Sequence, residues 1–141
     1  MARPLNRKSK GELAELRIAG DLVARGHKVA LPYGEDWDFD LIVCRDRLLE
    51  RVQVKYGRSD GAVLPVRCRS HSLTNGKVRA TKHYTAESID WLAVWDVTTD
   101  RCFYLPASEL GEGRSLLHLR LEPTRNGQRR GVRDAHRYAE I

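Results

Sequence analysis

The sequence predicts an α/β or α+β fold built around a mixed β-sheet, and three observations lead to this prediction. An amphipathic helical segment comes first in the chain. Three apolar strand segments follow it, and further strand and helix segments then alternate. This order favours helix packed on sheet. The 141 residues are 41% hydrophobic and 31% charged, which suits one compact domain over residues 1–141.

The first segment, residues 9–25, is predicted to be a helix that ends at Gly26. Ser9, followed by Glu12 three residues later, has the pattern of a capping box. At about 100° per residue, the helix has an apolar face of Ile18, Ala19, Leu22 and Val23 and an opposite face of Arg17, Asp21 and Arg25. Glu15 falls in the middle of the apolar face, where a carboxylate needs a partner or a metal ion.

Strand segments follow the helix. Residues 28–32 are expected to form a strand that leads into a loop. Residues 39–45 are continuously apolar, and we expect this strand to be central and buried on both faces. A turn at 45–48 connects it to a strand over 49–56. Pro65 interrupts the next strand, residues 62–69, which is therefore expected at a sheet edge.

The second half of the chain is predicted in less detail. Residues 70–84 are polar and basic, and we expect them to form a loop. The other expected elements are a helical turn at 85–90, a hairpin of 91–97 with 101–105, a helical turn opening with Pro106, a strand at 116–122 and a helix at 132–139.

Charge and cysteine content narrow the class of function. Lys and Arg number 25 against 19 acidic residues, a net charge of +6 that favours a polyanionic partner, nucleic acid first. No apolar run approaches the roughly 20 residues of a membrane helix, and no apolar core follows the basic N-terminus as in a secretion signal. Cys44, Cys68 and Cys102 are odd in number and far apart, which favours reduced thiols and a cytoplasmic location.

Four polar residues are expected to converge on the sheet. Strand side chains alternate, so Gln53 and Lys55 share one face. Asp40 opens the preceding strand and is expected to lie beside them. Glu15 comes from a helix that can pack on this sheet. Asp38 has the same strand parity as Asp40 and is its rival, and Glu15 could instead lie at the helix edge beside a surface arginine.

These groups suit phosphodiester hydrolysis. A hard divalent cation, Mg²⁺ or Mn²⁺, prefers oxygen ligands, which Asp40, Glu15 and the backbone carbonyl of Val54 can supply. Lys55 can orient or help to deprotonate the attacking water and offset charge on the phosphate. Gln53 can position the metal or its water. The basic residues expected to grip DNA phosphates are Arg67, Arg69, His71, Lys77, Arg79 and Lys82, extended by Arg129, Arg130 and Arg133.

The acid, the turn and Gln53-Val54-Lys55 together resemble the PD-(D/E)xK nuclease superfamily. An amide here replaces the usual second acid, which is similar to the group I intron-associated, homing-type branch with its Q-x-K variant. Segments 10–43, 52–58, 84–110 and 119–141 also resemble that branch. On these positions the family's helix acid falls on Glu15, its strand acid on Asp40, and its Q-x-K pair on Gln53 and Lys55.

The resemblance implies a restriction-endonuclease-like core, a mixed central sheet flanked by helices. It also implies a Mg²⁺-dependent DNA endonuclease that leaves 5′-phosphate and 3′-hydroxyl ends and works as a homodimer or homotetramer. Two alternatives stay open. A Holliday-junction resolvase would cut branched DNA but usually keeps a carboxylate where Gln53 stands. A catalytically degenerate DNA-binding module would bind DNA without cutting it.

Overall fold

The computed structural model describes residues 3–74, 77–122 and 131–141, and within 70–80 only the backbone. The elements, in chain order, are α1 (Arg7–Ala24), β1 (Lys28–Ala30), β2 (Leu41–Arg45), β3 (Leu48–Gly57), β4 (Val63–Arg67), β5 (Arg69–Thr74), β6 (Lys77–His83), β7 (Trp91–Asp96), β8 (Arg101–Pro106), the 3-10 helix η1 (Ala107–Leu110), β9 (Leu116–Arg120), β10 (Arg133–Asp134) and the 3-10 helix η2 (Ala135–Tyr138).

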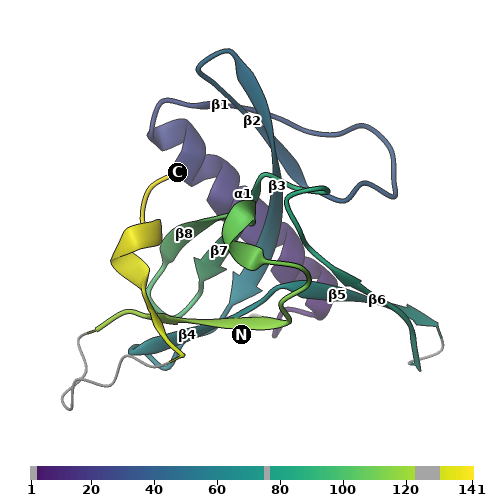
Figure 1. The fold of residues 1–141 in the computed structure, drawn as a ribbon, viewed down its shortest axis with the longest axis vertical. Coiled ribbons are helices and arrows are strands. Elements are labelled where there is room, and N and C mark those ends of the chain that lie inside the picture. The colour runs from purple at the N-terminus through teal and green to yellow at the C-terminus, as the bar shows by residue number, and fades with distance from the viewer. Residues whose placement is uncertain (1–2, 75–76, 123–130) are drawn as a thin grey trace.

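The described elements form layers around a five-stranded sheet of order β1-β2-β3-β7-β8. Within it β3 and β7 run parallel and the other pairs run antiparallel, so the sheet is mixed as predicted. α1 packs on one face of this sheet, and the small sheet β10-β9-β4 covers the other (Figure 1). Helices were expected to flank the sheet, but the described residues contain one α-helix and two short 3-10 helices.

α1 begins earlier than the capping box predicted. The Asn6 side chain accepts a 2.8 Å hydrogen bond from the backbone N–H of Ser9 and caps the helix, so a cap at Ser9 was wrong. Asparagine is as good an N-cap residue as serine. Because Asn6 precedes Ser9, the helix cap lies three residues earlier than predicted. The helix ends at Ala24, and Gly26 follows with a φ of 92°, a conformation that favours glycine.

The buried stripe of α1 consists of Ala14, Ile18 and Leu22, each 0% exposed. Val23 was predicted on this face but is 59% exposed. It lies a further 100° around the helix from Leu22, past the edge of the contact with the sheet. The stripe packs on Leu41, Val52 and Val54, among others, and so fixes which face of β3 the helix covers.

A tight hairpin joins β2 to β3. Asp46 and Arg47 both have positive φ, 50° and 64°, the conformation of a type I′ turn. We expected the strand over 39–45 to be central and buried on both faces, but β2 lies second from the sheet edge and only one of its faces is buried. β1 covers just three of its residues, and the central strand is β3.

The loop predicted over residues 70–84 is instead a β-hairpin. β5 and β6 pair antiparallel, with Arg69 opposite His83 and Ser70 opposite Lys82. The sequence contains the signal for this turn, since Asn-Gly at 75–76 is typical of two-residue hairpins. In Figure 1 the hairpin projects away from the layered body. Pro65 does stand on an edge strand, β4, as predicted.

The predicted helix over 132–139 is replaced by β10, which pairs with β9, and by the 3-10 helix η2. The predicted hairpin of residues 91–97 and 101–105 is confirmed as β7 and β8. The strand at 116–122 is confirmed as β9, and the turn after Pro106 as η1.

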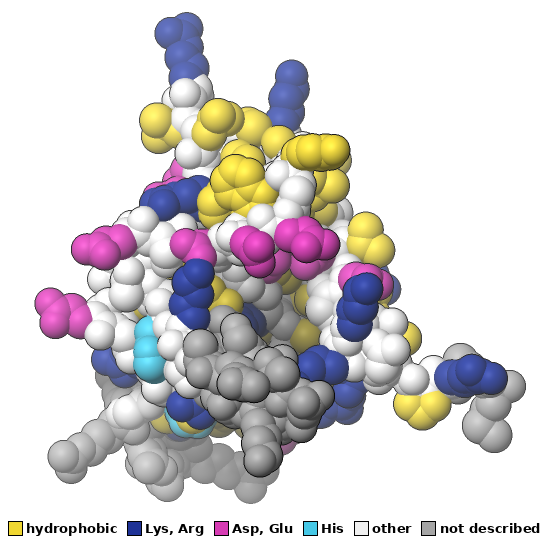
Figure 2. All heavy atoms as spheres, turned by 90° about the vertical axis from the view of Figure 1, so that its right-hand side faces the viewer, with side chains coloured by type: hydrophobic (Ala, Val, Ile, Leu, Met, Phe, Trp, Pro, Cys, Tyr) yellow, Lys and Arg dark blue, Asp and Glu magenta, His cyan; other side chains and the backbone are white. Residues whose placement is uncertain are grey.

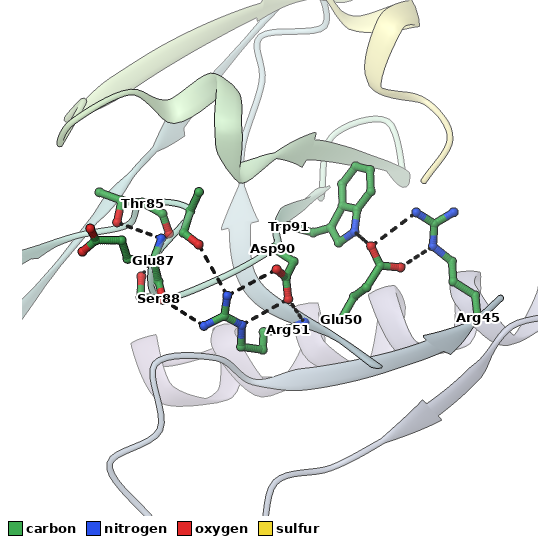
Figure 3. A network of polar contacts seen from close by, with 9 residues as sticks. Arg45, Glu50, Arg51, Thr85, Glu87, Ser88, Asp90 and Trp91 are labelled. Carbon is green, nitrogen blue, oxygen red and sulfur yellow. Dashed lines mark hydrogen bonds and ion pairs between the residues drawn. The ribbon is translucent and has the colours of Figure 1, made fainter. Parts of the chain in front are cut away.

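A polar network ties the turn before β7 to β3 (Figure 3). The Arg51 guanidinium contacts both carboxylate oxygens of Asp90 and the backbone carbonyls of Ala86 and Glu87. The backbone N–H of Arg51 also donates to Asp90, at 2.7 Å. This ion pair holds the pKa of Asp90 below its usual value. The turn that follows β6 is therefore attached to the central strand.

Candidate active site

The candidate site is built where β2 ends beside β3. Leu41, the first residue of β2, pairs with Val52, and the backbone N–H of Asp40 still donates to the Val52 carbonyl at 2.9 Å. Beyond that point the Asp40 carboxylate replaces the strand, accepting a 2.9 Å hydrogen bond from the N–H of Val54. The N–H and C=O of one residue point to the same side of a strand. The Val54 carbonyl therefore faces the same gap as the Asp40 carboxylate.

Lys55 lies on the face of β3 opposite α1. Its ammonium Nζ donates to the backbone carbonyl of Arg69 at 3.1 Å and lies 5.0 Å from the centre of the Tyr84 ring. Burial lowers the pKa of Lys55, and the charge of Asp40 opposes this shift. Lys55 and Asp40 are therefore close enough to interact electrostatically.

Glu15 reaches Asp40 from the helix side. Its pKa is raised from 4.5 to about 7, first by burial, then by the charge of Asp40 and a side-chain hydrogen bond with Asp40. Burial also raises the pKa of Asp40, against the hydrogen bond from Val54 and the charge of Lys55. The bond between the two carboxyls raises the pKa of Glu15 and lowers that of Asp40. The interaction between the two carboxyls therefore favours protonation of Glu15 over protonation of Asp40.

Gln53 is half-buried and shares the face of Lys55. Its side-chain nitrogen donates to the Val54 carbonyl at 3.4 Å. The amide of Gln53 therefore lies against the carbonyl that the sequence predicted as a metal ligand.

The convergence arises differently from the way we expected. α1 covers the face of β3 that carries Val52 and Val54, so Glu15 approaches from the side opposite to Gln53 and Lys55. Asp40 connects the two sides because its carboxylate lies at the open edge of β3. The described contacts link Glu15 and Lys55 through Asp40, and Gln53 to Val54.

The donor atoms at this edge suit a hard cation. They are the Glu15 and Asp40 carboxyls, the Val54 carbonyl and the Gln53 amide, all oxygen donors of the kind that Mg²⁺ and Mn²⁺ prefer. Within the described residues, no group of three or more His, Cys, Asp or Glu gathers as a metal cluster. All three cysteines have free thiols. The donors therefore fit a divalent oxygen-loving ion held by two carboxylates and neutral oxygens.

The residues predicted to bind DNA are spread over several elements. Arg67 is exposed on β4, and its charge contributes to the lowered pKa of Lys55. Arg69 opens β5, next to Lys55. Of His71, Lys77 and Arg79 the structure describes only the backbone, which places them on the β5–β6 hairpin. Arg129 and Arg130 lie outside the described residues.

Arg133 lies on a different strand of the small sheet, and its charge, like that of Lys55, acts on Cys68 between Arg67 and Arg69. It stands on β10, at the opposite edge of the three-stranded sheet from Arg67 on β4. Its guanidinium contacts the Glu109 backbone carbonyl and the Tyr138 hydroxyl, each at 3.4 Å.

Figure 2 faces the side from which the hairpin projects, and acidic side chains form a band there with Lys and Arg on either side.

The sequence did not predict two contacts at the site. Lys82 on β6 forms an ion pair with Asp38, two residues before Asp40. Asp38, the rival of Asp40, is thus engaged with the hairpin. The ring of Tyr84 lies under Lys55. The Asn-Gly turn signal could have revealed the hairpin and hence that its ends meet, but no pattern in the sequence pairs Tyr84 with Lys55.

The comparison with protein families decides the class of the protein. Residues 5–141 match the family model described as PD-(D/E)XK endonuclease. The chain belongs to the PD-(D/E)XK endonuclease family. It is therefore a nuclease, as the Gln53-Val54-Lys55 pattern and its flanks predicted. A search of curated proteins found no match.

A solved structure agrees with the fold of this endonuclease family member. The chain is similar to a bacterial homing endonuclease, I-Ssp6803I, with a TM-score of 0.76 and 19% sequence identity. The alignment covers 95% of this chain and 88% of that one. The predicted restriction-endonuclease-like fold is confirmed. No helix among the described residues is long and apolar enough to cross a membrane.

Proposed function

We propose that this endonuclease is a Mg²⁺- or Mn²⁺-dependent enzyme that hydrolyses phosphodiester bonds in double-stranded DNA, in the manner of a homing endonuclease. The observation that supports the proposal most is the position of Asp40. Its carboxylate lies at an open sheet edge. It interacts with the Glu15 carboxyl from the helix side of the sheet and with the Lys55 ammonium from the opposite face.

Asp40, Glu15 and the Val54 carbonyl would hold the cation. A divalent ion there supplies Lewis-acid polarisation of the phosphate and lowers the pKa of a bound water. Glu15 must give up its proton to serve as a ligand, because only a carboxylate binds the ion well. The Gln53 amide, which rests on the Val54 carbonyl, is placed to orient water or substrate beside that ligand.

Lys55 supplies the positive charge of the site. Its ammonium has three N–H groups, and Arg69 accepts from one of them. The remaining donors can contact the phosphate and offset the charge that builds on it during attack. Because burial lowers its pKa, more of Lys55 is a neutral amine than for an exposed lysine, and that neutral form can accept a proton from the attacking water.

The basic hairpin β5–β6 would bind the DNA backbone next to the site, through Lys77 and Arg79 and, from the strand before it, Arg67. One site cuts one strand, so a double-strand break calls for a homodimer or homotetramer. A DNA substrate and free thiols both suit a cytoplasmic protein.

The proposal is tested by incubating supercoiled plasmid, a linear duplex library and a four-way junction with the protein, with Mg²⁺ or with EDTA. We expect cutting that needs the metal and disappears in Lys55→Ala. Lys28→Ala, which removes an exposed lysine from β1, is the matched control and should cut like the wild type.

Each substrate answers a different question. Preference for linear duplex supports homing-type action, and preference for the junction supports a resolvase. If a protein that binds DNA cuts none of the three with Mg²⁺ or Mn²⁺, the nuclease assignment of this site is wrong and the chain acts as a binding module.

A further inference from the structure

The base of the β5–β6 hairpin closes around the side chain of Lys55. The Arg69 carbonyl at the start of the hairpin accepts from Nζ at 3.1 Å, and the Tyr84 ring just after its end lies 5.0 Å from the same atom. Tyr84 is only 4% exposed. We propose that Tyr84 is a positioning residue that aims the Lys55 ammonium at the scissile phosphate. This inference deepens the proposed nuclease function and rests on it.

Tyr84 is held firmly enough for this task. Its backbone N–H donates to the Cys68 carbonyl at 3.1 Å, which joins the two ends of the hairpin. The turn that follows it is attached to β3 by Arg51 through Asp90 and the carbonyls of Ala86 and Glu87 (Figure 3). Arg51 lies on the same strand as Lys55, four residues earlier. The ring of Tyr84 and the side chain of Lys55 are therefore both anchored to β3.

A ring is well suited to hold a reactive ammonium. The face of an aromatic ring attracts a cation without taking its proton, whereas a carboxylate would form a strong ion pair. The Lys55 side chain has four rotatable bonds, and the nearby charge of Asp40 draws it toward the metal ligands. The ring of Tyr84 and the carbonyl of Arg69 together keep Nζ in one place. At least one N–H stays available for substrate.

The hairpin also carries basic residues, so the same segment that contacts DNA holds Lys55. Lys82, two residues before Tyr84, is paired with Asp38, two residues before Asp40. The hairpin therefore contacts both the loop leading to the acid and the ammonium.

Two variants separate the ring from the rest of the side chain. Tyr84→Phe keeps the ring, and Tyr84→Leu removes it. For Tyr84→Leu we expect a loss of about 10- to 100-fold in the single-turnover cleavage rate at saturating DNA, because small misplacements of a catalytic group have effects of this size. The Kd for DNA should stay within about 2-fold, because Tyr84 itself is buried away from substrate. Tyr84→Phe keeps the ring and should lose far less rate than Tyr84→Leu.

A second readout tests the geometry without any cleavage. Nζ of Lys55 lies over the Tyr84 ring, 5.0 Å from its centre, so we expect the proton NMR signals of the adjacent CH₂ group to shift upfield in the wild type and in Tyr84→Phe. They should return to ordinary lysine values in Tyr84→Leu. If that variant does not fold at the assay temperature, Tyr84→Met, whose flexible unbranched side chain fills irregular gaps, replaces it.

The outcomes are distinct. A folded Tyr84→Leu that cleaves at the wild-type rate overturns the proposal, and so does a Tyr84→Phe that loses as much rate as Tyr84→Leu. An unshifted Lys55 signal in the wild type overturns it as well. A wild type that never cuts, but shows the ring shift, instead refutes the nuclease function on which the inference rests.

Discussion

The carboxylate of Asp40 accepts a 2.9 Å hydrogen bond from the backbone N–H of Val54 at the point where β2 has ended. The acid thereby occupies the place of a neighbouring strand, in the plane of the sheet. A side chain in that plane is accessible from both faces. Glu15 on the helix side and Lys55 on the opposite side therefore both interact with one carboxylate.

Glu15 gives the metal-free protein a pH-dependent stability. Its pKa is raised from 4.5 to about 7, so folding favours the protonated acid. That contribution is complete below pH 4.5 and is lost as the pH rises through 7. Glu15→Gln stays neutral, and above pH 7 we expect it to be more stable than the wild type, by on the order of 1 kcal/mol because solvent screens a half-buried carboxyl.

Urea unfolding of both proteins without metal, across this pH range, measures the difference. The two proteins should have equal stability in acid and diverge as the pH rises. A difference that does not depend on pH, or a less stable Glu15→Gln above pH 7, would contradict the assigned pKa. The same proton opposes metal binding, so the affinity of the wild type for Mg²⁺ should increase as the pH rises through about 7.

The ion pair between Asp38 and Lys82 competes with DNA for the lysine. Asp38→Asn frees Lys82 to contact a phosphate, so we expect DNA to bind about 3-fold more tightly. The salt dependence should also steepen by roughly one phosphate contact, a change of about 0.9 in the slope of log K against log salt. Fluorescence anisotropy with a labelled duplex over a salt series measures both quantities.

Glu35→Gln is the matched control for this prediction. Glu35 is exposed on the same loop, so the substitution removes an equal charge without releasing Lys82. Affinity should change less than in Asp38→Asn, and the slope should stay the same. Equal slopes in all three proteins would show that Lys82 does not reach the DNA backbone.

Gly57 ends β3 in a position where no side chain fits. A Cβ added there would lie 2.8 Å from Cδ1 of Leu64 and 2.9 Å from Cγ2 of Val94, both buried side chains. Gly57→Ala should therefore lower the free energy of unfolding by about 1–3 kcal/mol. Gly20 is exposed on α1 with nothing within 4 Å of such a Cβ, so Gly20→Ala should stabilise by up to about 1 kcal/mol. Urea titrations that find Gly57→Ala neutral would contradict the close packing between the two sheets at β3.

Local patterns predicted most of the elements. The period of α1, the turn at Asp46 and Arg47, and the apolar runs of β7 and β8 all depend on neighbours in the chain, which a sequence displays. Two predictions that depended on distant partners were wrong. The burial of β2 depends on how few residues β1 offers, and the exposure of Val23 depends on the width of the sheet under α1.

The sequence predicted which residues meet at the candidate site, because their chemistry is recognisable. It did not predict how they are arranged around the sheet. Acid, amide and lysine at short spacing on two strands suggested metal-dependent hydrolysis, and the family match is consistent with that chemistry. The alternation that paired Gln53 with Lys55 could not say which face α1 covers. Lys82 lies on the β5–β6 hairpin and Tyr84 directly follows it. The polar residues of that segment predicted a loop, so the contacts of Tyr84 with Lys55 and of Lys82 with Asp38 could be identified only in the structure.

Asp40→Asn in a plasmid-cleavage assay with Mg²⁺ tests the central claim most directly, with Asp38→Asn as its matched control. Asparagine can still accept the hydrogen bond from Val54, so the fold should survive while the charge that we propose to bind the cation is lost. We expect Asp40→Asn to cut at least about 100-fold more slowly than the wild type, and Asp38→Asn to keep cutting. A folded Asp40→Asn that cuts as fast as the wild type would contradict a metal-dependent centre at Asp40.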